Sequence, residues 1–586
     1  MIRTAIIALT VMAPCLYADG PARKPNVVVI LADDQCWGDL SVNGNTNLRT
    51  PHIDSLARDG ASFDRFFVQP VCSPTRAEFL TGRYHPRCGV RNVTSGGERL
   101  NLDESTIADT FKAAGYSTGC FGKWHSGSQY PYHPNGRGFD EYYGFTSGHW
   151  GEYFDPPLDH NGKAVRGRGY LADDMTTRAI EFLAANRQRP TLCYLAYNTP
   201  HSPMQVPDPY WARFASADLA LRGSGPGREN LPHTRAALAM CENLDANVGR
   251  LLRAIDESGS GSDTIVIYFS DNGPNGVRWN GGMKGRKGST DEGGVRSPLF
   301  VRWPGKVRAG TTIGGIAAAI DLFPTLADLA GVTPVGKKPR DGISLAPMLL
   351  GTGRGSVERT LLQHWAGKVS ARTPRYRLDA DGKLFDMIGD PGQAHDIASD
   401  RPREAEHLKR SVSEWRRDVL ADISKADDRP FPVGYPAFPS TTLPARDGVP
   451  HGGIRRSAPA PNCSFFTDWK TTDDRMTWQV EVATAGQYEA VIHYTCRAAD
   501  VGSSIELSLG DVRWETTVAK PHDSALRGQQ EDRVPRVGES YVKDFLPLSF
   551  GLRALKPGRQ MLTLRALKVA GAQIADVRSV ELILRP

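Results

Sequence analysis

The stretch "NVVVILADD" (residues 26–34) is a short apolar run that ends in two aspartates. A continuous run of Val, Ile and Leu is typical of a strand that is buried on both faces of a parallel sheet. Similar runs alternate with amphipathic helical stretches as far as about residue 335. This alternation predicts an α/β fold with a mostly parallel sheet covered by helices on both faces. The chemistry is then expected at the carboxyl ends of the strands.

Polar side chains follow several of these predicted strands directly. Asp33 and Asp34 end the first strand, and Asp271 and Asn272 end "TIVIYFSDN" (264–272). Burying two adjacent carboxylates destabilises a protein unless a positive charge lies next to them. Carboxylate and amide oxygens are ligands that suit a hard divalent cation. The sequence therefore predicts a calcium or magnesium site.

A second group of polar residues is cationic or carries a proton near neutral pH. Arginine offers a planar fork for tetrahedral oxyanions, lysine offers a point charge, and histidine can transfer a proton. Next to metal carboxylates, such a group is what transfer of a sulfuryl or phosphoryl group requires. Its members are Arg76, Lys123, His125, His201 and Lys287.

The segment "CSPTRAEFLTGR" (72–83) carries the motif C-x-P-x-R followed by L-T-G-R. It resembles the signature of the type I, formylglycine-dependent sulfatases of the alkaline phosphatase superfamily, and in particular secreted bacterial carbohydrate sulfatases and arylsulfatases. The resemblance covers residues 26 to about 425. Further matching motifs are "ADDQCWGD" (32–39), "GKWH" (122–125), "NTPHSP" (198–203), "FSDNG" (269–273) and "KGSTDEGGVR" (287–296).

The resemblance implies a role for each matching residue. Cys72 is expected to be oxidised to formylglycine by a maturase and to bind one Ca²⁺ together with Asp33, Asp34, Asp271 and Asn272. Arg76 would stabilise the hydrated aldehyde, which attacks sulfur. Lys123, His201 and Lys287 would bind the sulfate and assist the leaving oxygen. His125 would help the sulfated intermediate to break down.

Two lysines compete for one position in "GGMKGRKGSTDEGG" (281–294). Lys284 and Lys287 both precede the "EGG" segment, and the distance to that segment favours Lys287.

The resemblance also implies the domain organisation: an alkaline-phosphatase-like mixed sheet flanked by helices (19–350) and a small antiparallel subdomain with one helix (351–427). Residues 428–461 are Pro-rich and aperiodic, which predicts a linker, although ordered packing along the core is an alternative. Period-two alternation over 462–586 predicts a separate β-sandwich. It resembles carbohydrate-binding modules.

The first residues, "MIRTAIIALTVMAPCLYADG" (1–20), read as a secretory signal peptide over residues 1–18. This predicts a secreted or periplasmic protein without membrane insertion, because the apolar run is shorter than the ~20 residues that span a bilayer. A formal net charge of +6 over 586 residues is small, which argues against a nucleic-acid partner.

The nine cysteines are scattered without CxxC pairs, so neither a zinc site nor a dense disulfide framework is indicated. Cys463 and Cys496 fall in one late segment and are candidates for a disulfide.

A long insertion (128–170) is dense in aromatic residues, His and Arg. Aromatic faces pack on sugar rings, so a sulfated poly- or oligosaccharide is the expected substrate. Two alternatives are a phosphonate monoester hydrolase or phosphodiesterase, and a glycan-binding protein with an inactive enzyme domain. The candidate substrate-binding residues are Tyr132, His149, Trp150 and Trp279.

Overall fold

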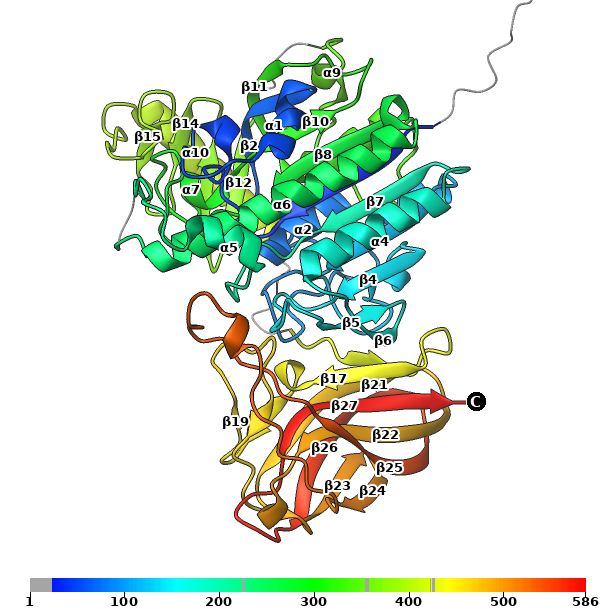
Figure 1. Cartoon of the computed structure of the whole chain (residues 1–586). Coiled ribbons are helices and arrows are strands. Elements are labelled where there is room, and N and C mark those ends of the chain that lie inside the picture. Colours follow the sequence, from blue (N-terminus) through cyan, green and yellow to red (C-terminus); the bar gives the residue numbers. More distant parts are fainter. Residues whose placement is uncertain (1–23, 224–226, 354–357, 422, 424–426) are drawn as a thin grey trace, which may run out of the picture.

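The computed structural model describes residues 24–223, 227–353, 358–421, 423 and 427–586. It has a large α/β domain and, beyond it, a C-terminal β-sandwich (Figure 1). The predicted signal peptide lies outside the described residues. Within the part that the structure describes, no helix has the length and apolar character needed to cross a bilayer.

The large sheet is built around β1 (Asn26–Ala32). This strand runs parallel to β7 (Thr191–Ala196) on one side and to β8 (Thr264–Ser270) on the other. Next to β7 lies the parallel strand β3 (Ser117–Lys123), and next to β8 lies the antiparallel strand β10 (Leu299–Arg302). The expected mixed sheet flanked by helices is thus confirmed.

Alternate side chains of β1 enter two different hydrophobic cores, which explains the continuous apolar run in the sequence. Val27, Val29 and Leu31 belong to one core, which includes residues of helices α2 (Cys72–Thr81), α3 (Ile107–Ala113) and α8 (Leu322–Leu329). Val28 and Ile30 belong to the other, which includes residues of α4 (Leu171–Ala185) and α6 (Leu231–Glu257). Burial on both faces fixes the strand at the centre of the domain.

The predicted antiparallel subdomain is present. Four strands pair in sequence order, and helix α10 (Pro402–Val419) packs on them through a small core that includes Leu408 and Trp415. The strands are β12 (Leu361–Trp365), β13 (Lys368–Arg372), β14 (Tyr376–Leu378) and β15 (Leu384–Asp386).

A buried ion cluster joins this subdomain to the large domain. Glu292, the first residue of α7 (Glu292–Val295), lies 2.7 Å from Arg372 and 3.4 Å from Arg377. It also contacts Arg296 at 2.9 Å. Burial raises the pKa of Glu292, but these arginines outweigh burial and lower the pKa to about 2.

Replacing this carboxylate is expected to destabilise the protein. Glu292→Gln leaves the fully buried guanidinium groups of Arg372 and Arg377 without a counter-charge, so the free energy of unfolding should fall by about 3 kcal/mol. Because the folded-state pKa is depressed, this contribution is fully present above the unfolded value of 4.5 and is lost as pH falls through about 2.

Urea denaturation at pH 7 and at about pH 3 measures the difference in the free energy of unfolding between wild type and Glu292→Gln, which should be smaller at the lower pH. The exposed Glu406→Gln is the control. Equal unfolding midpoints for Glu292→Gln and Glu406→Gln would show that the cluster does not stabilise the fold.

The C-terminal sandwich consists of two sheets that share one hydrophobic core. One sheet contains β21 (Arg475–Val482), β26 (Gly558–Lys568), β23 (Ser504–Leu509) and β24 (Val512–Thr517). The other contains β20 (Phe466–Thr467), β27 (Asp576–Arg585), β22 (Gly486–Thr495) and β25 (Leu546–Leu555).

The prediction of a linker over 428–461 is wrong, because this segment supplies strands to the sandwich. β16 (Phe431–Val433) and β18 (Val449–His451) pair with β21, β17 (Ser440–Pro444) pairs with β27, and β19 (Arg455–Arg456) pairs with β20. Proline lacks an N–H, so it is tolerated in short edge strands of this kind. The prolines therefore obscured the strand pattern in the sequence.

The suggested disulfide between Cys463 and Cys496 is also absent, and neither thiol is bonded to another cysteine of the described residues. Cys463 Sγ lies 3.4 Å from the carbonyl oxygen of His149 in the large domain. Cys496 instead follows β22, and its backbone forms an isolated antiparallel β-bridge with His522. The two cysteines therefore face different neighbours.

Candidate active site

The acidic residues of the site are placed by two neighbouring parallel strands. Ala32 at the end of β1 is in register with Ser270 at the end of β8, so the residues that follow them meet at one sheet edge. These residues are Asp33, Asp34, Asp271 and Asn272, all at most 1% exposed. Asp34 adopts a φ of 64°, an uncommon backbone conformation for a non-glycine residue. The strands thus hold three carboxylates together away from solvent.

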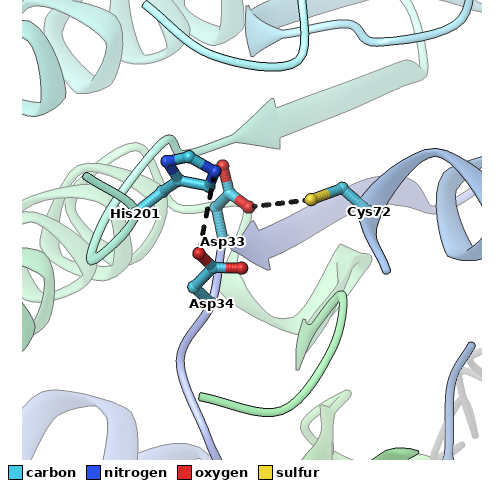
Figure 2. Close-up of side chains that lie close together, drawn as sticks. All are labelled: Asp33, Asp34, Cys72 and His201. Carbon is cyan, nitrogen blue, oxygen red and sulfur yellow. Dashed lines mark hydrogen bonds and ion pairs between the residues drawn. The ribbon is translucent and has the colours of Figure 1, made fainter. Parts of the chain in front are cut away.

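Helix α2 brings Cys72 and Arg76 to the same edge. Cys72 is its first residue, and its Sγ lies 3.6 Å from Asp33 Oδ1. Arg76, one turn later, donates to Asp271 Oδ2 from Nε at 3.2 Å and from Nη2 at 2.8 Å. Figure 2 shows the side chains of Cys72, Asp33, Asp34 and His201 converging.

Two lysines reach the aspartates from different parts of the chain. Lys123, at the end of β3, lies with its Nζ 2.6 Å from Asp33 Oδ2. Lys287 lies with its Nζ 2.7 Å from Asp34 Oδ1. Lys284 instead lies 3.6 Å from Asp291, so it is Lys287 that the structure places beside the aspartates.

Two predicted histidines flank this group and are neutral. His201 Nε2 lies 3.7 Å from Asp34 Oδ2, and its Nδ1 donates to the Ser202 carbonyl at 2.7 Å. His125 Nε2 lies 2.8 Å from the Val93 carbonyl oxygen, and its buried Nδ1 has no hydrogen-bond partner among the residues that the structure describes. Burial, reinforced by Lys287, lowers the pKa of His201 to about 3, and burial next to Lys123 lowers the pKa of His125.

The electrostatics of the cluster keep its thiol protonated. Burial raises the pKa of Cys72 to about 12, despite the lysines nearby, so the unmodified side chain is a poor nucleophile. Burial and the adjacent Asp33 raise the pKa of Asp271 to about 6. At Asp34, Lys287 and the other positive neighbours outweigh burial and lower the pKa.

The residues present fit a hard divalent cation. Asn272 lies at the same sheet edge as three buried carboxylates and donates to Asp34 Oδ1 at 2.7 Å, and its own buried Oδ1 accepts no hydrogen bond from any described residue. A buried amide oxygen without a donor is rare and costly, and a cation is one group that would satisfy it. Asp33, Asp34 and Cys72, together with His201, also form a group whose possible ligand atoms lie within 4.8 Å of one another.

Of the four predicted substrate-binding residues, the structure brings one to the site. The ring of His149 lies 5.7 Å from that of His201 between centroids. Tyr132 is buried under Arg99, and Trp150 stacks on Phe145. Trp279 packs against Trp37 and Arg222.

Tyr132 is buried, whereas Trp150 and Trp279 are half-buried and packed on neighbouring rings or a guanidinium group, so a role for these three residues in sugar binding stays a prediction. A sequence pattern records that an aromatic residue is present but not which surface it covers.

Two neighbours of this site were not predicted from the sequence. Ser202 accepts hydrogen bonds at its carbonyl oxygen from His201 and His149. Its hydroxyl donates to Glu539, which belongs to the C-terminal sandwich. Ser202 lies within the "NTPHSP" segment, whereas Glu539 is 337 residues further on in a loop without a recognisable pattern.

The fold and this site define an enzyme of the alkaline-phosphatase-like class, with acidic and cationic side chains at the carboxyl ends of parallel strands. A sulfatase family model matches residues 25–332. Human arylsulfatase A is 33% identical over 69% of this chain and 82% of its own length. Mouse N-acetylgalactosamine-6-sulfatase is 31% identical over 59% of this chain and 70% of its own length.

A solved structure supports the same assignment. Ps i-CgsB in complex with k-i-k-neocarrahexaose is 31% identical, with a TM-score of 0.62, over 68% of this chain and 93% of that chain. The chain therefore belongs to the sulfatase family, and it is a sulfuric ester hydrolase.

Proposed function

We propose that this enzyme removes sulfate from a sulfated poly- or oligosaccharide, with formylglycine derived from Cys72 as the nucleophile. The observation that carries the proposal is the position of Cys72, which is buried beside Asp33 with lysines and Arg76 around it. A thiol with a pKa of about 12 cannot serve as a thiolate at neutral pH. Oxidation by a maturase, which replaces its sulfur and two hydrogens by one oxygen, removes that limitation.

Asp33, Asp34, Asp271 and Asn272 would hold one Ca²⁺ together with the oxidised Cys72 side chain. The cation would neutralise negative charge on the sulfate ester. Around it, Lys123 and Lys287 are placed to attract sulfate oxygens, and Arg76 fixes the Asp271 carboxylate through two hydrogen bonds.

His201 is proposed to assist departure of the alcohol. Its Nδ1 proton is held by the Ser202 carbonyl, so Nε2 is the nitrogen that is available to the reaction. Assistance at the leaving oxygen then requires a second proton, on Nε2, which the alcohol takes as it departs. His125 is the corresponding candidate for collapse of the sulfated intermediate, since its Nδ1 is the unpaired nitrogen.

The saccharide part of the proposal draws on the relatives. One is named for N-acetylgalactosamine, and one was solved with a neocarrahexaose bound. We extend this substrate class to the present chain, together with export to the periplasm or the medium.

A panel of defined sulfated oligosaccharides, with desulfated products identified by chromatography, tests the substrate class. Release of sulfate from nitrophenyl sulfate but from none of the saccharides would contradict it. Faster hydrolysis of phenylphosphonate than of nitrophenyl sulfate would favour the phosphonate monoester hydrolase instead.

The two neighbouring lysines provide a matched test of the site. Lys287→Ala should lower kcat/KM on nitrophenyl sulfate by about 10²-fold, because it removes a cation aimed at developing negative charge. Lys284→Ala should stay within about 3-fold of wild type, since Lys284 faces Asp291 rather than the aspartate cluster. Equal losses in the two variants would reject the assignment of Lys287.

A further inference from the structure

A loop of the C-terminal sandwich reaches the active site. Residues 527–542 lie between β24 and β25 and are closed at their base by a bridge between Arg527 and Val542. In Figure 1 this segment is the orange loop that extends from the sandwich to the large domain near α5 (Asp208–Phe214). We call it the 527–542 loop.

The loop is bonded to the segment that carries His201. The backbone N–H of Arg533 donates to the Met204 carbonyl at 2.9 Å, and the Arg533 side chain donates to the Val206 carbonyl at 2.8 Å. Gln205 Nε2 donates to Asp532 Oδ1 at 2.8 Å. Because these bonds run to backbone and to buried groups, they fix the position of the loop relative to His201.

Arg536 holds the loop in shape and attaches it to a second part of the large domain. Its guanidinium donates to Asp532 Oδ2 at 2.9 Å and to the Ser540 carbonyl at 2.8 Å within the loop. Its Nη2 also donates to the Gly151 carbonyl at 2.8 Å. The loop is therefore held in one conformation by its own hydrogen bonds and is attached to the large domain.

A cavity of about 430 Å³ lies between the 527–542 loop and the catalytic side chains. Its volume lies within the ~300–1,000 Å³ that is usual for small-molecule sites. Val537, 92% exposed, presents an apolar surface next to carboxylates and cations. The lining includes Asp34, His201 and Lys287 from the large domain and Val534, Val537 and Glu539 from the loop.

Glu539 is the loop residue whose carboxylate lies within 4.8 Å of ring nitrogens of both His149 and His201. Its carboxylate accepts a hydrogen bond from the Ser202 hydroxyl and lies 3.6 Å from His149 Nδ1. Although burial raises its pKa, the adjacent His149 and the hydrogen bond from Ser202 lower it, so Glu539 is ionised at neutral pH. A carboxylate accepts hydrogen bonds only, and its charge disfavours a sulfate directly against it. It suits a neighbouring group that carries O–H or N–H donors.

His149, His201 and Glu539 also lie close enough to suggest a second cation site. The hydrogen bonds argue against this. Nδ1 of both histidines faces the Ser202 carbonyl, at 3.1 Å for His149 and 2.7 Å for His201, so both Nδ1 atoms carry protons and only the Nε2 atoms keep a lone pair. A cation held there would occupy the Nε2 of His201 that is assigned to the reaction.

We propose that the 527–542 loop forms one wall of the substrate pocket, and that Glu539 accepts a hydrogen bond from a hydroxyl or amide N–H of the sugar that bears the scissile sulfate. The inference rests on the proposed saccharide substrate. The sandwich is then part of the active site and determines specificity, which differs from the expected role of a separate carbohydrate-binding module.

The test compares Glu539→Ala with wild type on nitrophenyl sulfate and on sulfated galactose and N-acetylgalactosamine oligosaccharides. Loss of one hydrogen bond to a charged acceptor should lower kcat/KM on the cleaved saccharide by about 10- to 100-fold. Hydrolysis of nitrophenyl sulfate, which lacks the donors, should fall by a clearly smaller factor than hydrolysis of the saccharide. Glu539→Gln, which keeps the shape and one acceptor oxygen, should recover part of the saccharide activity.

Glu531→Ala is the matched control, because Glu531 lies in the same loop and is not among the residues that line the cavity. Equal losses on both substrates for Glu539→Ala would overturn the proposal, since Glu539 would then act only through Ser202 and His201. Unchanged saccharide hydrolysis would overturn it as well. A wild-type enzyme that cleaves nitrophenyl sulfate but no saccharide would overturn the saccharide function and this inference together. Melting temperatures of all variants identify any loss of folding.

Discussion

Cys72→Ala is expected to abolish hydrolysis of nitrophenyl sulfate, with a loss in kcat of roughly 10⁴-fold or more. Alanine cannot be converted to the aldehyde, so the variant lacks the nucleophile on which the rest of the site acts. The fold should be retained, because a small buried side chain is replaced by one of similar size at the start of α2.

Cys88→Ala is the matched control for this variant. Cys88 is also buried and also has a pKa raised mainly by burial, but its Sγ faces Thr81 and Arg83 instead of the aspartate cluster. It should therefore remain active. Full activity of Cys72→Ala would reject the proposed nucleophile.

The modification itself can be measured on wild-type protein. In an active preparation, mass spectrometry of the tryptic peptide that ends at Arg76 should show one oxygen in place of the sulfur and two hydrogens of Cys72. Co-expression with a maturase should raise this fraction and the specific activity in proportion. A fully active sample with an unmodified Cys72 would contradict the mechanism.

The second large effect is expected from the cation site. Asp34→Ala should lower kcat by about 10³-fold, because it removes one carboxylate from the proposed calcium ligands and also the partner of Lys287. The surface variant Asp59→Asn, in which only an exposed pair with Arg58 changes, should behave as wild type.

Binding of the cation has a readout that does not depend on activity. Treatment with a chelator should lower the melting temperature of the wild-type protein, and Ca²⁺ should restore it. At about 100-fold excess of free Ca²⁺ over Kd, the stabilisation is about 2.7 kcal/mol. The response should be absent in Asp34→Ala. An identical thermal response in that variant would show that calcium binds elsewhere.

Several features could be predicted from the sequence because they depend on local patterns. The apolar run before Asp33 predicted a central strand, and the structure places that strand between two parallel neighbours with both faces covered. The convergence of Asp34 and Asp271 followed from the rule that parallel strands end at the same sheet edge. The motif around Cys72 identified the family before the geometry was known.

Other features could not be predicted in this way. The short strands in 428–461 were read as a linker, because each contains too few residues to show the alternation of apolar and polar side chains that marks a strand. They are stabilised by pairing with strands far away in the chain. The packing of Tyr132, Trp150 and Trp279 was equally out of reach, because composition does not record which ring faces are covered by neighbouring side chains.

The sequence by itself determined the sheet, the family and the set of acidic and cationic residues at the site, because hydrophobic periodicity and short motifs act over neighbouring residues. The sequence favoured Lys287 over Lys284, but only the tertiary structure shows that Lys287 reaches Asp34 while Lys284 faces Asp291, and that Glu539 from the sandwich lies against Ser202. Both outcomes depend on where distant segments pack. Such contacts are fixed by the burial and hydrogen bonding of the whole chain, which no local pattern contains.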